Sequence, residues 1–500
     1  MKFKILALLL VAFVTSSCKK LLEPDPNKTG SSLAVNFYID YAGALQGING
    51  IYASTRDVYR NIWPLDELSD DSYGGTNRQT IEENNLLPND GIPGSLFTSS
   101  YQAIGRINIF LARVPNIANL SVNENILRNQ FVGEAKTLRA LHYFNLVRLF
   151  GEVPLVLDEQ TDIEALDVPR ASVAAVYAQI QKDLTEAIAV LPASHPNTGL
   201  VQPIPASLTG GREKGRVTSI LAKAILGHAY LTLKDFVNAD LHLSQAVSDA
   251  AANGVVLNNI YSQNFEALGG PELSNESLFE AAFVPIATLP GAQHAFPAFF
   301  GPPEDNPTGV AAFNWNAPTD KAMPAMENLN NTLAQAFLPG DLRKASTIKY
   351  NTIEYPATAT TPRSINAKFW VRGQGNQGSS NWPIYRLADV ILLAAEAKQG
   401  NNQEPAALEL LNRVHAHSRT GLTAYVGLTG DALRNAIRLE RRVELALEGK
   451  RYFDLLRWGN LATVMAAHGS PVINVQRNGL LPIPQGEREK NPNLTQNPGY

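Results

Sequence analysis

Residues 217–252 read VTSILAKAILGHAYLTLKDFVNADLHLSQAVSDAAA, and this stretch decides the fold class. Small and apolar residues recur at helical spacing on both sides of a polar break at Lys234-Asp235, which predicts two helices joined by a turn. The intervals match the tetratricopeptide pattern, in which an alanine follows the glycine of the first helix after twelve residues. The matching positions are Leu226, Gly227, Tyr230 and Ala239. Small residues at such points allow two antiparallel helices to approach closely.

Similar spacing predicts further helix pairs along the chain. They are 40–59 with 95–113, 130–150 with 172–191, and the two halves of 386–418. One pair cannot bury a core by itself, so repeats of this kind stack into a curved superhelix. The expected architecture is mainly α: a tetratricopeptide-like α-superhelix of about four helix pairs. Amphipathic helices of an unrelated α-fold are the alternative.

Two long segments do not follow the helical pattern. Residues 57–94 and 255–385 are rich in Pro, Gly, Asn and Thr and contain only short apolar runs. We therefore predict loop-rich insertions that carry a few short strands. Loops of this length in a compact domain usually have a function.

The first residues are typical of an exported lipoprotein. Lys2 and Lys4 flank the start of an apolar run at 5–14, which is long enough for a secretory signal and too short to span a bilayer. Cys18, the single cysteine of the chain, follows three small residues. Since an exported protein with one cysteine cannot form an internal disulfide, the thiol needs another role. The arrangement resembles a bacterial lipobox, in which this cysteine is acylated and becomes the mature N-terminus.

The expected domain organisation follows from these features. Residues 1–17 are predicted to be a lipoprotein signal peptide, 18–34 a lipidated flexible tether, and 35–500 a single domain. The tether is rich in Pro, Asn, Gly and Ser, from which no core can be built. The net charge of −4 argues against a nucleic-acid partner, which would require a basic surface.

Four blocks carry a family resemblance. They are GEAKTLRALHYFNLVRLFGEVPL at 133–155, ERRVELALEGKRYFDLLRWG at 440–459, LPIP at 481–484 and QNPGY at 496–500. In this order they resemble the SusD/RagB-type family of outer-membrane nutrient-binding lipoproteins. The resemblance implies a tetratricopeptide-based scaffold and a cell-surface position on the outer membrane through the lipid anchor. It also implies nutrient capture, with a SusC-type TonB-dependent transporter as the partner.

Several motifs resemble catalytic, nucleotide-binding or metal-binding sites, but a structural role explains them better. Glu440 and Glu444 share one helix face with apolar residues and have arginines nearby, which favours a buried ion-pair network over a catalytic pair. The glycines within 373–378 match a dinucleotide motif, but no helix can open there. His415 and His417 point to different helix faces, so no metal site is expected. We predict no catalytic residue and no cofactor.

Glycan recognition requires aromatic rings that stack on sugar faces, surrounded by polar side chains. The two insertions offer such groups. Trp315 and Tyr73 are the predicted stacking platforms. The predicted ligand-site neighbours of Trp315 are Asn314, Asn316, Phe299 and Phe300. Those of Tyr73 are Asn77 and Arg78.

The sequence therefore predicts non-enzymatic capture of an oligosaccharide or polysaccharide nutrient and its delivery to the transporter. Three alternatives stay open at this stage. The ligand could be a peptide or another non-glycan nutrient, which would be recognised by strand edges and charged pockets. A surface glycoside hydrolase would need a spaced carboxylate pair, and none is evident. A tetratricopeptide assembly factor without a small ligand is the third.

Overall fold

The computed structural model describes most of the predicted domain. The described residues are 37–62, 64–72, 81, 85–159, 167–195, 215–265, 274–283, 332–350, 364–366, 368–369, 381–469, 477 and 479–500. The predicted signal peptide and tether at 1–34 lie outside them, so that part of the domain organisation stays a prediction. Among the described helices, none combines the length and apolarity needed to cross a membrane.

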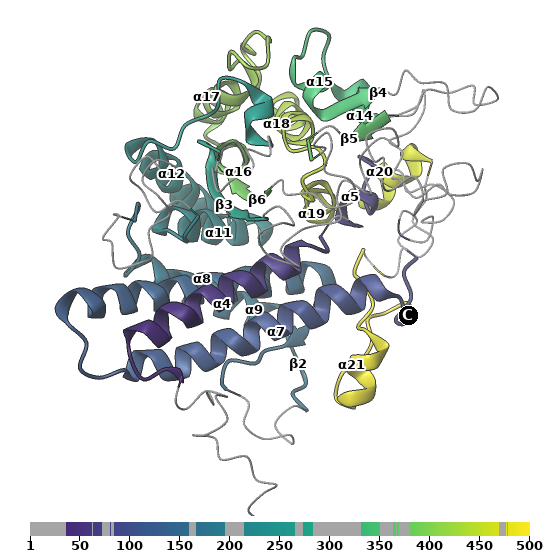
Figure 1. The fold of residues 1–500 in the computed structure, drawn as a ribbon. Helices are drawn as coiled ribbons and strands as arrows, with labels where there is room; N and C mark the ends of the chain where they lie inside the picture. Colours follow the sequence, from purple (N-terminus) through teal and green to yellow (C-terminus); the bar gives the residue numbers. More distant parts are fainter. Residues whose placement is uncertain are drawn as a thin grey trace, which may run out of the picture.

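The described residues form the predicted mainly α, tetratricopeptide-like fold. Each predicted pair is present and its two helices pack together: α4 (Tyr41–Tyr59) with α7 (Gly91–Arg113), α8 (Val122–Phe150) with α9 (Val173–Ile188), α11 (Ser219–Thr232) with α12 (Phe236–Ala252), and α16 (Leu387–Gly400) with α17 (Glu404–His415). Neighbouring pairs also touch, through α4–α8, α9–α11 and α12–α16. Figure 1 shows α4, α7, α8 and α9 as one layer of long helices beside the α11–α12 and α16–α17 pairs.

Local sequence signals explain where these helices begin and turn. Ser121 and Glu124 form a reciprocal capping box at the start of α8, which satisfies two backbone donors that have no partner within the helix. Asp235 caps α12 by accepting from the backbone N–H of Asn238. The turn before it requires a left-handed backbone at Lys234, whose φ is +63°. The predicted turn at Lys234-Asp235 is therefore confirmed.

The remaining elements lie in the two insertions, in the shorter connections between helices, or after the last helix pair. The helical ones are α5 (Pro64–Glu67), η1 (Val114–Asn116), η3 (Tyr261–Asn264), α14 (Thr332–Ala336), α15 (Arg343–Thr347), α18 (Gly430–Glu444), α19 (Arg451–Trp458), α20 (Leu461–His468) and α21 (Gln485–Lys490). The described strands form antiparallel two-stranded sheets: β1 (Val153–Pro154) with β2 (Arg170–Ala171), β3 (Ser277–Ala281) with β6 (Trp382–Arg386), and β4 (Ile348–Tyr350) with β5 (Ser364–Asn366). Short strands were predicted for the second insertion, and β3 to β6 confirm this.

Two tryptophans contact the core in different ways. Trp382 is buried and stacks on Phe369 with ring centroids 4.7 Å apart. Trp458 is only partly buried, at the edge of the core. Its ring lies against the guanidinium groups of Arg438 and Arg457, and its indole N–H donates to Glu396 at 2.9 Å. Cation–π contacts of this kind hold the ring between solvent and core.

Gly227 permits the close approach that the repeat pattern predicts. A Cβ at this position would lie 2.6 Å from Cγ of Leu243 and 3.0 Å from the Leu243 backbone nitrogen. No side-chain movement can relieve the contact with the backbone atom. The α11–α12 pair therefore depends on glycine here.

We expect Gly227→Ala to lower the free energy of unfolding by about 1–3 kcal/mol, because the added methyl group overpacks the helix interface. Urea unfolding followed by circular dichroism measures this change. The matched control is Gly105→Ala in α7, where a Cβ meets nothing within 4 Å. That control should gain up to about 1 kcal/mol from helix propensity. Equal effects of the two substitutions would contradict the packing argument.

Candidate functional site

The ligand residues predicted from sequence fall outside the described part of the chain. These are Trp315, Asn314, Asn316, Phe299, Phe300, Tyr73, Asn77 and Arg78, and the lipidation candidate Cys18 is a further one. Their roles stay predictions. Asp70 and Asp71, which precede Tyr73, are described and are buried in ion pairs with Arg451 and Arg442. Both carboxylates are therefore engaged by arginines, and Asp71 Oδ2 is buried without a hydrogen-bond partner.

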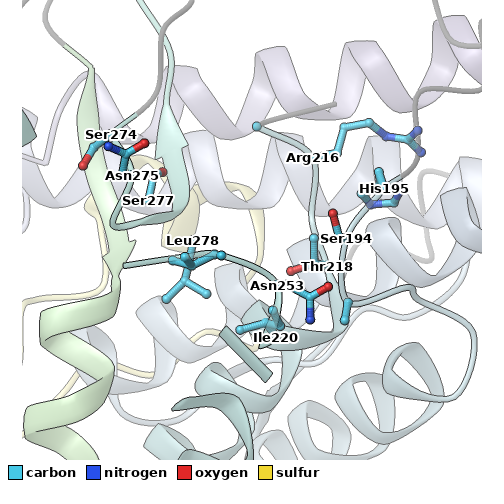
Figure 2. Close-up of a pocket in the computed structure, with 14 residues that line it drawn as sticks. Ser194, His195, Arg216, Thr218, Ile220, Asn253, Ser274, Asn275, Ser277 and Leu278 are labelled. Carbon is cyan, nitrogen blue, oxygen red and sulfur yellow. The ribbon is translucent and has the colours of Figure 1, made fainter. Parts of the chain in front are cut away.

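The described residues do enclose a surface pocket with a volume of about 100 Å³. It lies where the N-terminus of α11, the C-terminal end of α12 and the start of β3 meet. Figure 2 shows Ser274, Asn275 and Ser277 on one side of it and Ser194, Thr218 and Asn253 on the other. Apolar surface comes from Ile220, Val255 and Leu278.

The pocket presents mainly neutral hydrogen-bonding groups. Four hydroxyls and two carboxamides line it, from Ser194, Thr218, Ser274, Ser277, Asn253 and Asn275. The hydroxyl oxygen of Ser277 is buried and has no hydrogen-bond partner. Buried polar groups are normally paired, so this oxygen is a candidate for a ligand or water contact. The arrangement suits a neutral ligand that carries hydroxyl groups beside apolar C–H surface.

The charge of Arg216, the one arginine of the described lining, is neutralised by an ion pair with a buried carboxylate. Arg216 donates to the buried carboxylate of Glu134, and Tyr52 donates its hydroxyl to the same carboxylate at 2.6 Å. The Tyr52 oxygen also accepts from the backbone N–H of Val217 at 2.8 Å. Burial raises the pKa of Tyr52 well above its usual value, so this hydroxyl stays protonated. The pocket wall is therefore fixed and close to neutral.

The described lining does not provide the groups for glycoside hydrolysis. It contains no Asp, Glu or Cys, whereas hydrolysis of a glycosidic bond needs two carboxyl groups at a defined separation. His195 is in contact with the carbonyl oxygen of Val217 at 2.6 Å through Nε2. What the lining can do chemically is bind and orient a ligand.

Sequence reasoning did not find this pocket. Its residues come from the end of one helix, the start of another and the first residues of a strand, and none belongs to a recognisable motif. Asn253 ends α12 as an ordinary cap, and Asn275 precedes β3. These residues form a pocket only because the fold brings them close together in space.

The carboxylates of the 440–459 block form the predicted structural network. Glu444 is fully buried and accepts from Arg343, Arg386 and Arg419 at 2.8, 2.6 and 2.7 Å. Burial alone would raise the pKa of Glu444, but the three guanidinium charges reverse this and hold the pKa well below its usual range. A carboxylate held ionised in this way cannot serve as a general acid.

The network extends to both sides of Glu444. Glu440 accepts from Arg343 and lies 2.7 Å from Nδ1 of His415, whose ring stacks on Tyr425. Glu448 accepts from Arg386 at 2.8 Å and from Lys368 at 2.7 Å. Within the described residues, no group of three or more His, Cys, Asp or Glu side chains is placed to hold a metal ion. The glycines of 373–378 lie outside these residues.

Helix α18 ends at Glu444, and Leu445 is its C-cap. Gly449 lies in the following turn with φ +68°, and its N–H donates to Asp66 at 2.8 Å. The glycine is needed for the turn and for this contact rather than for the helix end.

Two family models match the chain. The model described as "SusD family" matches residues 347–500, and the model described as "Starch-binding associating with outer membrane" matches residues 22–206. Together they include the helix pairs at both ends of the scaffold and the 440–459 block. The chain belongs to the SusD/RagB family.

Relatives match over nearly the whole length. "SusD-like protein P2" of Formosa agariphila is 27% identical over 534 residues, with 100% of each chain covered. A solved structure described as "Laminarin binding SusD-like protein" has a TM-score of 0.69 and 26% identity, and the match covers 91% of this chain and 99% of that one. A SusD-like carbohydrate binding protein from Bacteroides fragilis has a TM-score of 0.72 at 21% identity and covers 92% of this chain and 100% of its own, which supports the fold.

We expect Glu444→Gln to lower the free energy of unfolding by about 3–5 kcal/mol, because three buried arginines lose their shared carboxylate. The acid sensitivity should change as well. A carboxylate with a lowered pKa stabilises the fold above about pH 4.5, its unfolded value, and this contribution is lost as the pH falls. Urea unfolding between pH 3 and 7 measures both effects. In Glu444→Gln the free energy of unfolding should therefore fall less steeply as the pH is lowered below about 4.5 than in the unmodified chain.

The matched control for this experiment is Glu489→Gln, since Glu489 is exposed on α21. Its effect should stay within about 0.5 kcal/mol. A Glu444→Gln protein that loses ligand binding but keeps its stability would show that the network is functional rather than structural.

Proposed function

We propose that this chain captures oligosaccharides at the cell surface, without cleaving them, and delivers them to a SusC-type TonB-dependent transporter in the outer membrane. The observation that carries the proposal is the match over 91% of the chain to a laminarin-binding SusD-like protein at 26% identity. The family description that associates starch binding with the outer membrane supports the same role.

The described pocket supports a glycan as the ligand class. Neutral hydroxyls and carboxamides next to small apolar surfaces complement a sugar, which presents hydroxyls around C–H faces. A peptide would be better matched by an exposed strand edge and charged pockets. Shallow sites of this kind bind in the micromolar to millimolar range, or roughly −4 to −8 kcal/mol.

The aromatic residues of the insertions are the proposed primary platforms. Trp315 and Tyr73 would stack on sugar faces. The proposed polar and apolar surroundings are Asn314, Asn316, Asn77, Arg78, Phe299 and Phe300. The pocket of Figure 2 then adds a second contact for a longer chain.

Membrane attachment is proposed through Cys18. Acylation of this thiol and removal of residues 1–17 would leave 18–34 as a tether to the folded domain. A tether of this length lets the domain reach a partner in the same membrane.

We expect affinity electrophoresis of the chain from Lys19 onward to show retardation by one neutral polysaccharide in a panel that includes laminarin. Trp315→Ala and Tyr73→Ala should each weaken binding about 10-fold or more, since stacking of an aromatic ring on a sugar face contributes on the order of 1–2 kcal/mol. Ser194→Trp, which fills the pocket of Figure 2, should weaken binding of long chains more than of short ones.

The control for the panel is Val426→Ala, because Val426 is 88% exposed and distant in sequence from every proposed ligand residue. Its retardation should equal that of the unmodified chain. Retardation by no polymer, together with binding to peptides, would contradict the proposed ligand class. Appearance of shortened glycans in the same incubation would contradict the non-enzymatic role.

We expect Cys18→Ala to move the protein from the outer-membrane fraction to the soluble fraction, because the acylated thiol is removed. Mass spectrometry of the native protein should find an acylated N-terminal Cys18. Ser17→Ala, which keeps a small residue before the cysteine, is the control and should stay in the membrane. A native N-terminus elsewhere would exclude the anchor.

A further inference from the structure

Part of the polar lining of the Figure 2 pocket is already used within the protein. The hydroxyl of Ser274 donates to Asn264 at 2.6 Å and accepts from Asn258 at 2.8 Å. The carboxamide of Asn275 donates to Asn258 at 3.2 Å. These groups hold the turn before β3 together, so they offer fewer hydrogen bonds to a ligand than their number suggests.

Three hydroxyls on two sides of the pocket remain for a ligand. Ser277 lies on one side, and its buried oxygen has no hydrogen-bond partner. Ser194 and Thr218 lie on the other side. Thr218 accepts from the backbone N–H of Leu221 as the N-cap of α11, which leaves its own proton to donate. A hydroxyl both donates and accepts, so this set matches the hydroxyls of a sugar.

The positive charge at the pocket is cancelled by a residue that does not line it. Arg216 lines the pocket, and its partner Glu134 is fully buried in α8. Tyr52 holds the same carboxylate in place by donating its hydroxyl at 2.6 Å. An acidic sugar would therefore have to compete with Glu134 for Arg216, which would place two carboxylates on one cation.

The start of α11 also contributes to the pocket, and a helix N-terminus favours negative charge through its free N–H groups. Here the N–H of Ser219 donates to the carbonyl of Pro192 at 2.9 Å. The N–H of Leu221 donates to the Thr218 hydroxyl at 3.4 Å. Both bonds remove donors that an anion would need, so the helix start does not replace the charge that Glu134 cancels.

We propose that this pocket selects an uncharged sugar residue of the captured glycan, with Ser277 as a contact to the sugar and Glu134 as the positioning residue that excludes uronic acids. The pocket volume of about 100 Å³ is below the roughly 300–1,000 Å³ of pockets that enclose a whole ligand, so it takes one residue of a longer chain. Glu134 acts through Arg216, because without it the guanidinium would be free to bind a carboxylate. The inference rests on the proposed glycan capture and adds a selectivity to it.

The test follows the methyl groups of Ile220, Val255 and Leu278, which line the pocket, by NMR in the chain from Lys19 onward. The probes are the methyl glycosides of glucose, galactose and mannose and those of the three corresponding uronic acids, titrated at pH 8. At least one neutral glycoside should shift these methyl signals saturably, with a Kd in roughly the millimolar range. Its acidic counterpart should bind about 10-fold more weakly or less. The methyl signals of exposed Val426 should not move.

Two variants test the role of the ion pair. Glu134→Gln leaves the charge of Arg216 uncompensated, so the acidic glycoside should bind at least about as tightly as the neutral one. A purely structural role of Glu134 would change both affinities together and leave their ratio unchanged. Ser194→Lys adds a cation to the pocket without removing Glu134, and it should favour the acidic glycoside in the same way. This second variant keeps the test decisive if Glu134→Gln does not fold.

A third variant tests the sugar contact. Ser277→Ala removes a hydroxyl that has no partner in the protein, so it should weaken binding of the neutral glycoside about 3- to 10-fold without loss of stability. The matched control is Ser99→Ala in α7, whose hydroxyl donates to the carbonyl of Ser95 outside the pocket. That control should leave the affinity unchanged.

The outcomes separate this inference from the capture role. Equal affinities for the neutral and acidic glycosides in the unmodified chain overturn the selectivity. Retardation by a polysaccharide while no neutral glycoside shifts the pocket methyl signals overturns the pocket assignment alone and leaves capture standing. Selective shifts without retardation by any polysaccharide support the pocket assignment and contradict capture of a polymer.

Discussion

The buried carboxylate of Glu444, shared by three arginines, is the interaction on which the rest of the structure depends. Each of these charges would be costly to bury alone, and together they are neutralised and hydrogen-bonded. The arginines come from α15, from β6 and from the segment after α17, which are far apart in the sequence. The network therefore fixes the second insertion against the last helices of the scaffold. It also explains why the 440–459 block is so rich in charge without being catalytic.

Helix pairing and ion pairing stabilise different parts of the molecule. The helix pairs approach closely through small residues such as Gly227, and their contacts are mainly apolar. The segments between them have no such periodic face, so they are held by specific polar contacts such as Asp66 with the turn at Gly449. Apolar packing tolerates many substitutions of similar volume. A buried polar network does not, because removing one partner leaves the others unpaired.

This difference decides what could be predicted from the sequence. The helix pairs were predictable because their period and the twelve-residue interval from Gly227 to Ala239 are local properties of the chain. The structural role of Glu440 and Glu444 was also predictable, since arginines stand beside them. Their actual partners were not, because Arg343, Arg386 and Arg419 come from segments whose packing no local pattern encodes. The pocket of Figure 2 was missed for the same reason, since its residues share no motif.

The separation between scaffold and insertions has a consequence for how ligand specificity can vary. Arg216 at the pocket is held by Glu134 of α8 and by Tyr52 of α4, so this wall belongs to the rigid helical layer. Opposite to it, Ser277 and Leu278 belong to β3, which is fixed through β6 and Arg386 to the Glu444 network. Both walls are thus set by interactions that the fold itself requires. Of the pocket's carboxamides, Asn275 donates to Asn258, whose backbone N–H donates to Glu276 of the network. Asn253 donates to the carbonyl of Asp249 in its own helix. Under the proposed function, substitutions at Ser194 or Asn253 would therefore change ligand recognition with less effect on the scaffold than substitutions at Asn275.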